Sequence, residues 1–162
     1  RKDCYGGSLD NRIRFPLEVC AAVRRVVPDN IPLFMRISAT EHVENGWDIN
    51  HSIYLSNKAS KTGVDLVDCS SGGNSQKQTV VSYPGYQVSY AKEIKEKTDM
   101  YTGAVGMITD PIQANNIIET GEADIVLLGR ELLRNPYWPN YAKKTLTNTT
   151  NYPNPYSSIE KS

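Results

Sequence analysis

The sequence has no surplus of charge of either sign, because its 18 Lys and Arg residues equal its 18 Asp and Glu residues. A chain without net charge has no long-range attraction to nucleic acid or to an anionic membrane surface. It also lacks an apolar run near the roughly 20 residues that a transmembrane helix needs, and residues 1–4 lack the apolar core of a secretory signal. We therefore expect a cytoplasmic protein with neither a nucleic-acid nor a membrane partner.

Cysteine is also scarce. Cys4, Cys20 and Cys69 form an odd set without the paired spacing of a zinc site. A disulfide framework or a metal centre is therefore not expected, and the thiols should be reduced. The sequence begins with Arg1 rather than Met, which indicates a fragment or a processed product.

Four short apolar runs follow one another along the chain, and a helical pattern follows each of them. Such runs are typical of parallel strands covered on both faces. The predicted strands are residues 32–38, 64–69, 101–106 and 124–129. The predicted helices include 49–60, 86–97, a segment that begins at Asp110-Pro111, and 137–146, and a further helix precedes the first strand.

This order predicts an α/β fold of about four β/α units, which is half of a (β/α)₈ TIM barrel. A whole barrel typically needs about 250 residues, whereas this chain has 162. Residues 1–146 would form the half-barrel, and residues 147–162, rich in Asn, Thr, Pro and Ser, an extended C-terminal tail. The open sheet edges predict pairing with a missing N-terminal half of the barrel or self-association as a homo-oligomer.

Two of the predicted strands end in glycine. Gly106 follows the third strand, and Gly129 with Arg130 follows the fourth. In TIM barrels the last two such loops, with the N-terminus of a short extra helix, commonly form a phosphate-binding site. A guanidinium group adds a fork of donors that suits phosphate oxygens. We therefore predict a phosphate cradle made by these three residues.

Two further candidates follow the first two strands. Arg36 interrupts an apolar strand, where a charge needs a partner. It could pair with a neighbouring carboxylate, or point into the barrel mouth toward an anionic ligand, and its place near the strand end favours the second interpretation. Ser71 and Gly72 follow the second strand and could contact a polar ligand, although an ordinary flexible loop would have the same composition.

Other polar residues receive structural interpretations. His42 and Trp47 lie in an irregular loop, where we expect them to pack rather than to catalyse. Arg24 and Arg25 lie on a predicted helix, and we expect them to form a solvated basic face.

Several longer stretches resemble one family. These are residues 1–12, 33–38, 65–72, 84–88, 104–109 and 128–136. Together, in this order, they resemble the C-terminal half of the Old Yellow Enzyme family of flavoproteins, also known as the NADH:flavin oxidoreductase/NADH oxidase family. The resemblance is strongest to its bacterial-type NADPH dehydrogenase or ene-reductase branch.

The resemblance implies an FMN-binding TIM barrel of which this chain supplies strands five to eight. Arg36 would lie beside the pyrimidine edge of the flavin, and Gly106, Gly129 and Arg130 would hold the FMN phosphate. The family reaction passes a hydride from NADPH or NADH through the flavin to a small-molecule substrate, an activated alkene such as an enone. The family's substrate-anchoring His pair and its Tyr proton donor lie upstream of the position of Arg1, so no residue here is predicted to be catalytic.

A different class of function remains open on these residues. The chain could be a half-barrel that binds phosphate ligands, or self-associates through its open edges, without catalysis. Another phosphate-handling barrel enzyme, such as an isomerase, fits the glycine turns but leaves Arg36 unexplained.

Overall fold

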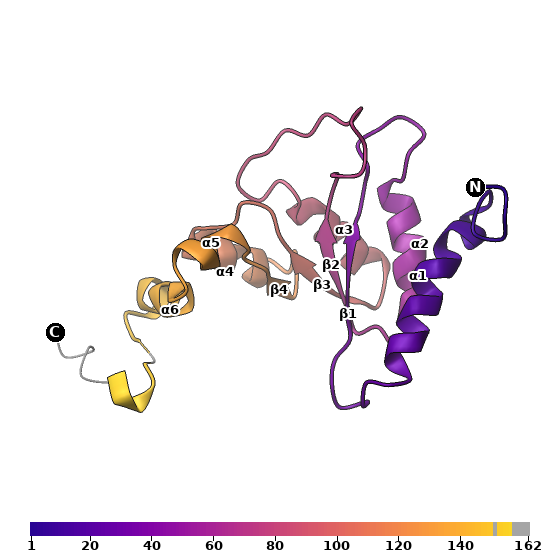
Figure 1. The fold of residues 1–162 in the computed structure, drawn as a ribbon. Helices are drawn as coiled ribbons and strands as arrows, with labels where there is room; N and C mark the ends of the chain where they lie inside the picture. The colour runs from indigo at the N-terminus through magenta and orange to yellow at the C-terminus, as the bar shows by residue number, and fades with distance from the viewer. Residues whose placement is uncertain (151, 157–162) are drawn as a thin grey trace.

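A computed structural model describes residues 1–150 and 152–156 (Figure 1). In this part of the chain four strands form one parallel sheet in the order β1-β2-β3-β4. The strands are β1 (Phe34–Ser38), β2 (Leu66–Ser70), β3 (Tyr101–Ala104) and β4 (Ile125–Val126). The helices are α1 (Leu9–Arg24), α2 (Ile49–Ser60), α3 (Val88–Lys97), α4 (Pro111–Glu119), α5 (Arg130–Arg134) and α6 (Trp138–Thr147).

The first turns of three helices are capped by polar side chains. Ser8 accepts a hydrogen bond from the amide of Asn11, Asp48 from that of His51, and Asp110 from that of Ile112. Each cap satisfies an amide that has no partner within its own helix. None of the described helices is long and apolar enough to span a membrane.

The strand register divides the sheet into two different faces. Met35, Val67 and Thr102 are register partners, as are Ile37, Cys69 and Ala104. These residues point to the helix side, where Val67, Cys69 and Ala104 pack in the apolar core with residues of α2, α3, α4 and α6. The α/β architecture with a parallel sheet is therefore confirmed.

The opposite face carries the alternate residues and is only partly covered. Phe34, Leu66 and Tyr101 form one row across β1, β2 and β3, and Arg36, Asp68 and Gly103 form the next. Phe34 is 52% exposed and Tyr101 is 65% exposed, whereas Leu66 between them is only 5% exposed. Large apolar residues at these exposures indicate a face that a further layer would stabilise.

The last two strands are shorter than the predicted 101–106 and 124–129. Strand β3 ends at Ala104 because the chain turns at Gly106 and Met107, which have φ angles of +121° and +52°. Strand β4 is an edge strand, and beyond it only the amide of Leu127 continues the pairing, by donating to the carbonyl of Ala104 at 2.8 Å.

One helix residue differs from the prediction of a solvated face. The Arg24 guanidinium donates to the carbonyls of Val27, Pro28, Ile31 and Gly63 at 2.8 to 3.3 Å, and its side chain is only 17% exposed. It therefore ties the end of α1 to the loops that precede β1 and β2. Arg25 is exposed, as predicted.

The C-terminal end of the last helix differs slightly from the prediction. Helix α6 continues to Thr147, one residue beyond the predicted end of the half-barrel, and ends at Asn148 in a left-handed conformation. In the predicted tail, residues 154–156 form a short 3₁₀ turn. Residues 151 and 157–162 of the predicted tail lie outside the part of the chain that the structure describes.

The environments of the three cysteines lead to a chemical prediction. Cys4 is exposed, whereas Cys20 and Cys69 are buried. Burial, with a smaller contribution from the charge of Asp68, raises the pKa of Cys69 to about 12, and burial also raises the pKa of Cys20. Because the thiolate is the reactive form, a thiol reagent at pH 8 should modify Cys4 quickly in the native chain and all three thiols after unfolding. Equal reaction of two or more thiols in the native chain would contradict this arrangement.

Candidate functional site

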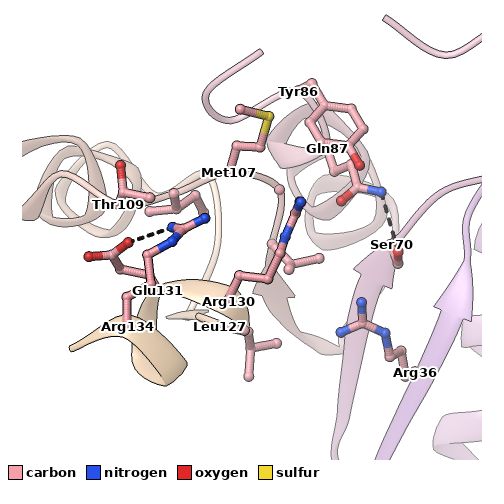
Figure 2. A pocket seen from close by; sticks show the side chains of 14 residues that line it. Arg36, Ser70, Tyr86, Gln87, Met107, Thr109, Leu127, Arg130, Glu131 and Arg134 are labelled. Carbon is pink, nitrogen blue, oxygen red and sulfur yellow. Dashed lines mark hydrogen bonds and ion pairs between the residues drawn. The ribbon is translucent and has the colours of Figure 1, made fainter. Parts of the chain in front are cut away.

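A cavity of about 320 Å³ lies at the carboxyl edge of the sheet (Figure 2). Its walls come from Arg36 of β1, Ser70 at the end of β2, residues 105–109 after β3, and residues 129–131 after β4. Because all four strands are parallel, their carboxyl ends meet at this edge. The sheet therefore brings Arg36, Gly106, Gly129 and Arg130 to one site.

Three arginines line the cavity. The Arg134 guanidinium is paired with Glu131 at 3.0 Å, whereas no ion pair involves Arg130 among the described residues. Figure 2 shows the Arg130 side chain crossing the cavity toward Met107 and Gln87, and the Arg36 guanidinium turned toward the same space. The lining therefore carries excess positive charge and is suited to an anion.

The backbone at Gly129 leaves room and donors for such an anion. Gly129 is exposed, and a Cβ added there would meet no atom within 4 Å. Its carbonyl accepts from the amides of Leu132 and Leu133, but the amides of Gly129, Arg130 and Glu131 donate to no carbonyl of the described backbone. These amides are free to donate to a ligand.

The loop after β3 forms the opposite wall and is tightly packed. A Cβ on Gly106 would lie 3.0 Å from Oε1 of Gln87 and 3.1 Å from the ring of Tyr86. The carbonyl of Gly106 accepts from the amide of Gly85 at 2.7 Å. Only glycine adopts a φ of +121° without strain, so this residue permits both the turn and the close contact.

Gln87 links two walls of the cavity, although sequence reasoning gave it no role. Its side chain is buried, and Nε2 donates to Oγ of Ser71 at 2.9 Å and lies 3.3 Å from Oγ of Ser70. Gln87 lies within the stretch 84–88 of the resemblance and in the first turn of the predicted helix 86–97, whereas the structure places it just before α3, which begins at Val88.

Ser71 and Gly72 lie behind the cavity rather than in its lining. The Ser71 hydroxyl accepts from Gln87, and the Gly72 amide donates to the carbonyl of Thr40 at 2.8 Å. In the described structure these two residues shape the loop after β2, and Ser70, the last residue of β2, is the one that lines the cavity.

Arg36 both pairs with a carboxylate and faces the cavity, so its position agrees with each of the two interpretations. Its Nη1 donates to Oδ2 of Asp68 at 2.7 Å, which is the predicted pairing with a neighbouring carboxylate. The same side chain also lines the cavity together with Arg130. Pairing therefore does not withdraw the guanidinium from the site.

Two tryptophans support neighbouring loops. The Trp138 indole donates to the carbonyl of Thr109, a cavity residue, at 2.7 Å, and thereby joins α6 to the loop after β3. The Trp47 indole donates to the hydroxyl of Ser52 at 2.6 Å, and His42 lies edge-on to the ring of Tyr90. The predicted packing roles of His42 and Trp47 agree with these contacts.

These features define a class of protein, namely an α/β protein with an arginine-lined anion site at the carboxyl edge of a parallel sheet. Residues 1–149 match the NADH:flavin oxidoreductase / NADH oxidase family, and the chain belongs to that family.

The chain is similar to curated bacterial proteins named NADPH dehydrogenase. It is 45% identical over 156 residues to that of Halalkalibacterium halodurans, which covers 96% of this chain and 45% of the relative. It is 47% identical over 146 residues to that of Bacillus subtilis, which covers 90% of this chain and 42% of the relative. The chain thus spans less than half the length of these relatives.

Solved structures share the fold. A 2-naphthoyl-CoA reductase in complex with 2-naphthoyl-CoA has a TM-score of 0.80 at 26% identity, covering 91% of this chain and 23% of that one. The histamine dehydrogenase from Rhizobium sp. 4-9 has a TM-score of 0.74 at 26% identity, covering 90% of this chain and 21% of that one.

The match confirms that the chain belongs to the predicted family of flavin oxidoreductases. The lining of the cavity is compatible with a phosphate group such as that of FMN. A phosphate requires room and hydrogen-bond donors. The open space beside Gly129 offers the room, and the donors are the free amides of residues 129–131 and the guanidinium of Arg130, which has no ion-pair partner among the described residues.

The packing of Gly106 generates a stability prediction. Gly106→Ala should lower the free energy of unfolding by about 2 kcal/mol, because alanine would be strained at a positive φ and would also crowd Gln87 and Tyr86. Gly121→Ala is the matched control, since its φ is +72° but its Cβ would meet no atom within 4 Å. The control substitution should lower the free energy of unfolding by only about 1 kcal/mol. Urea unfolding measures the loss of stability in each variant. Equal losses in the two variants would show that crowding against Gln87 does not contribute.

Proposed function

We propose that this chain carries the FMN phosphate and flavin-edge sites of an FMN-dependent NAD(P)H oxidoreductase of the ene-reductase type. The observation that carries the proposal is the convergence of Arg36, Gly106, Gly129 and Arg130 on one cavity at the carboxyl edge of the sheet. The similarity to proteins named NADPH dehydrogenase supports it.

Gly129 and Arg130 would hold the phosphate. The exposed amides of residues 129–131 would donate to its oxygens, and the Arg130 guanidinium would balance its charge. Gly106 would let the opposite wall approach, while Ser71 and Gly72 would support the end of β2 at Ser70. Helix α5 has only five residues, so individual amides rather than a long helix dipole would supply the attraction.

Arg36 would act at the flavin ring. A guanidinium beside the pyrimidine edge would stabilise negative charge that develops there. The chemistry supplied at this site would be hydride transfer from NADPH or NADH through the flavin to an activated alkene such as an enone. No residue of this chain is assigned as proton donor.

The exposed apolar residues on the face opposite the helices support completion of the barrel by further β/α units. Exposed Phe34 and Tyr101 would be covered by the strands that close a (β/α)₈ barrel. The same exposure supports a second candidate, self-association of a half-barrel without catalysis. Sedimentation of the chain separates the two, since the second candidate requires a stable oligomer that takes up no flavin and oxidises no NADPH.

Gly129→Ala tests the phosphate site without disturbing the fold. The added methyl group would meet no atom within 4 Å and so should change the free energy of unfolding by less than about 1 kcal/mol, but it would occupy the space proposed for phosphate. We expect the variant, with the completing β/α units supplied, to bind FMN at least tenfold more weakly and to bind riboflavin unchanged. Fluorescence titration with the two flavins measures both affinities.

Arg130→Ala should show the same selective loss, because it removes the unpaired guanidinium. Arg25→Ala is the control, an exposed arginine of the loop after α1 that lies away from the cavity. Equal losses for FMN and riboflavin, or no FMN uptake by the completed wild-type protein, would overturn the proposed function.

A further inference from the structure

The Arg36–Asp68 pair combines an exposed cation with a nearly buried anion. The two residues are register partners on β1 and β2 and lie on the face of the sheet opposite the helices. Their side chains meet at 2.7 Å, and 55% of the Arg36 side chain is exposed but only 13% of that of Asp68. The carboxylate is therefore desolvated while its partner keeps much of its contact with water.

This arrangement contributes little to folding. A carboxylate loses hydration on burial and needs replacement partners, yet Oδ1 of Asp68 is buried without a hydrogen-bond partner among the described residues. Because the guanidinium is exposed, the ion pair contributes only a weak attraction to stability. Stability of the sheet thus does not account for an aspartate at this position.

The pair does restrain Arg36. A long arginine side chain at a half-exposed position has many rotamers, and the bond to Oδ2 of Asp68 is its only hydrogen bond within the described part of the chain. That bond engages Nη1 and leaves Nε and Nη2 without a partner among residues 1–150 and 152–156. Figure 2 shows the guanidinium turned toward the space that Arg130 enters.

We propose that Asp68 is a positioning residue that holds the Arg36 guanidinium in the orientation in which it contacts the flavin ring. Asp68 acts through Arg36 and does not itself touch the ligand. This inference rests on the proposed flavin site, and it assigns the Asp68 carboxylate a function in binding rather than in folding.

A double-mutant cycle tests this coupling, with riboflavin as the probe because it lacks the phosphate group. Measured on the chain together with the units that complete its sheet, Asp68→Leu should weaken riboflavin binding about tenfold. Asp68→Asn keeps an acceptor for Nη1 of Arg36 and should lose less riboflavin affinity than Asp68→Leu. The Arg36→Leu/Asp68→Leu double variant should bind as Arg36→Leu alone does, because without Arg36 there is nothing for Asp68 to position. Urea unfolding of Asp68→Leu should show no loss of stability.

Asp65→Asn is the matched control. Asp65 also pairs with an arginine, Arg24 at 3.5 Å, and accepts from the Leu33 amide at 2.7 Å, but it lies outside the cavity. Its replacement should leave riboflavin affinity unchanged. Additive losses in the double variant, or wild-type affinity in Asp68→Leu, would overturn the inference while leaving the proposed function intact. Failure of the completed wild-type protein to bind any flavin would instead overturn the proposed function, and this inference with it.

Discussion

The parallel register of the four strands is the constraint on which the site depends. Register pairs Arg36 with Asp68 and Asp68 with Gly103, so the residues of one row share one face of the sheet. The same direction of all strands places the loops after β3 and β4 at the edge where Arg36 lies. Residues almost one hundred positions apart in sequence therefore line one cavity. A slip of one residue in β1 would turn Arg36 to the helix side and expose Met35 instead.

The two faces of the sheet have different functions. The helix side holds the apolar core and accounts for most of the burial, which stabilises the fold in proportion to the apolar area removed from water. The opposite side carries polar groups that do not help folding, among them Oδ1 of Asp68, which has no partner among the described residues, and the exposed guanidinium of Arg36. Polar residues that a stable core would not require are concentrated where a ligand is proposed to bind, which agrees with the general location of sites at the carboxyl ends of parallel strands.

Local sequence signals predicted much of this structure. Helix α2 has the predicted bounds, and Asp110-Pro111 begins α4 as its capping pattern indicated. Gly129 and Arg130 line the cavity with Arg36, as glycine-ended strands in a barrel suggested. The errors were non-local. The burial of Arg24 depends on loop carbonyls from two other segments, and the role of Gln87 depends on Ser71, sixteen residues away in sequence. Strand β4 has only two residues because its pairing partner β3 ends at Ala104, which the apolar run 124–129 does not reveal.

Amide hydrogen exchange at residues 129–131, with and without FMN, tests the central claim most directly. These amides donate to no described backbone carbonyl, so they should exchange quickly in the flavin-free protein. If they hold the phosphate, saturating FMN should slow their exchange by at least tenfold, whereas riboflavin should leave it unchanged. Protection by both flavins alike, or none while FMN is bound, would contradict a phosphate site built on Gly129 and Arg130.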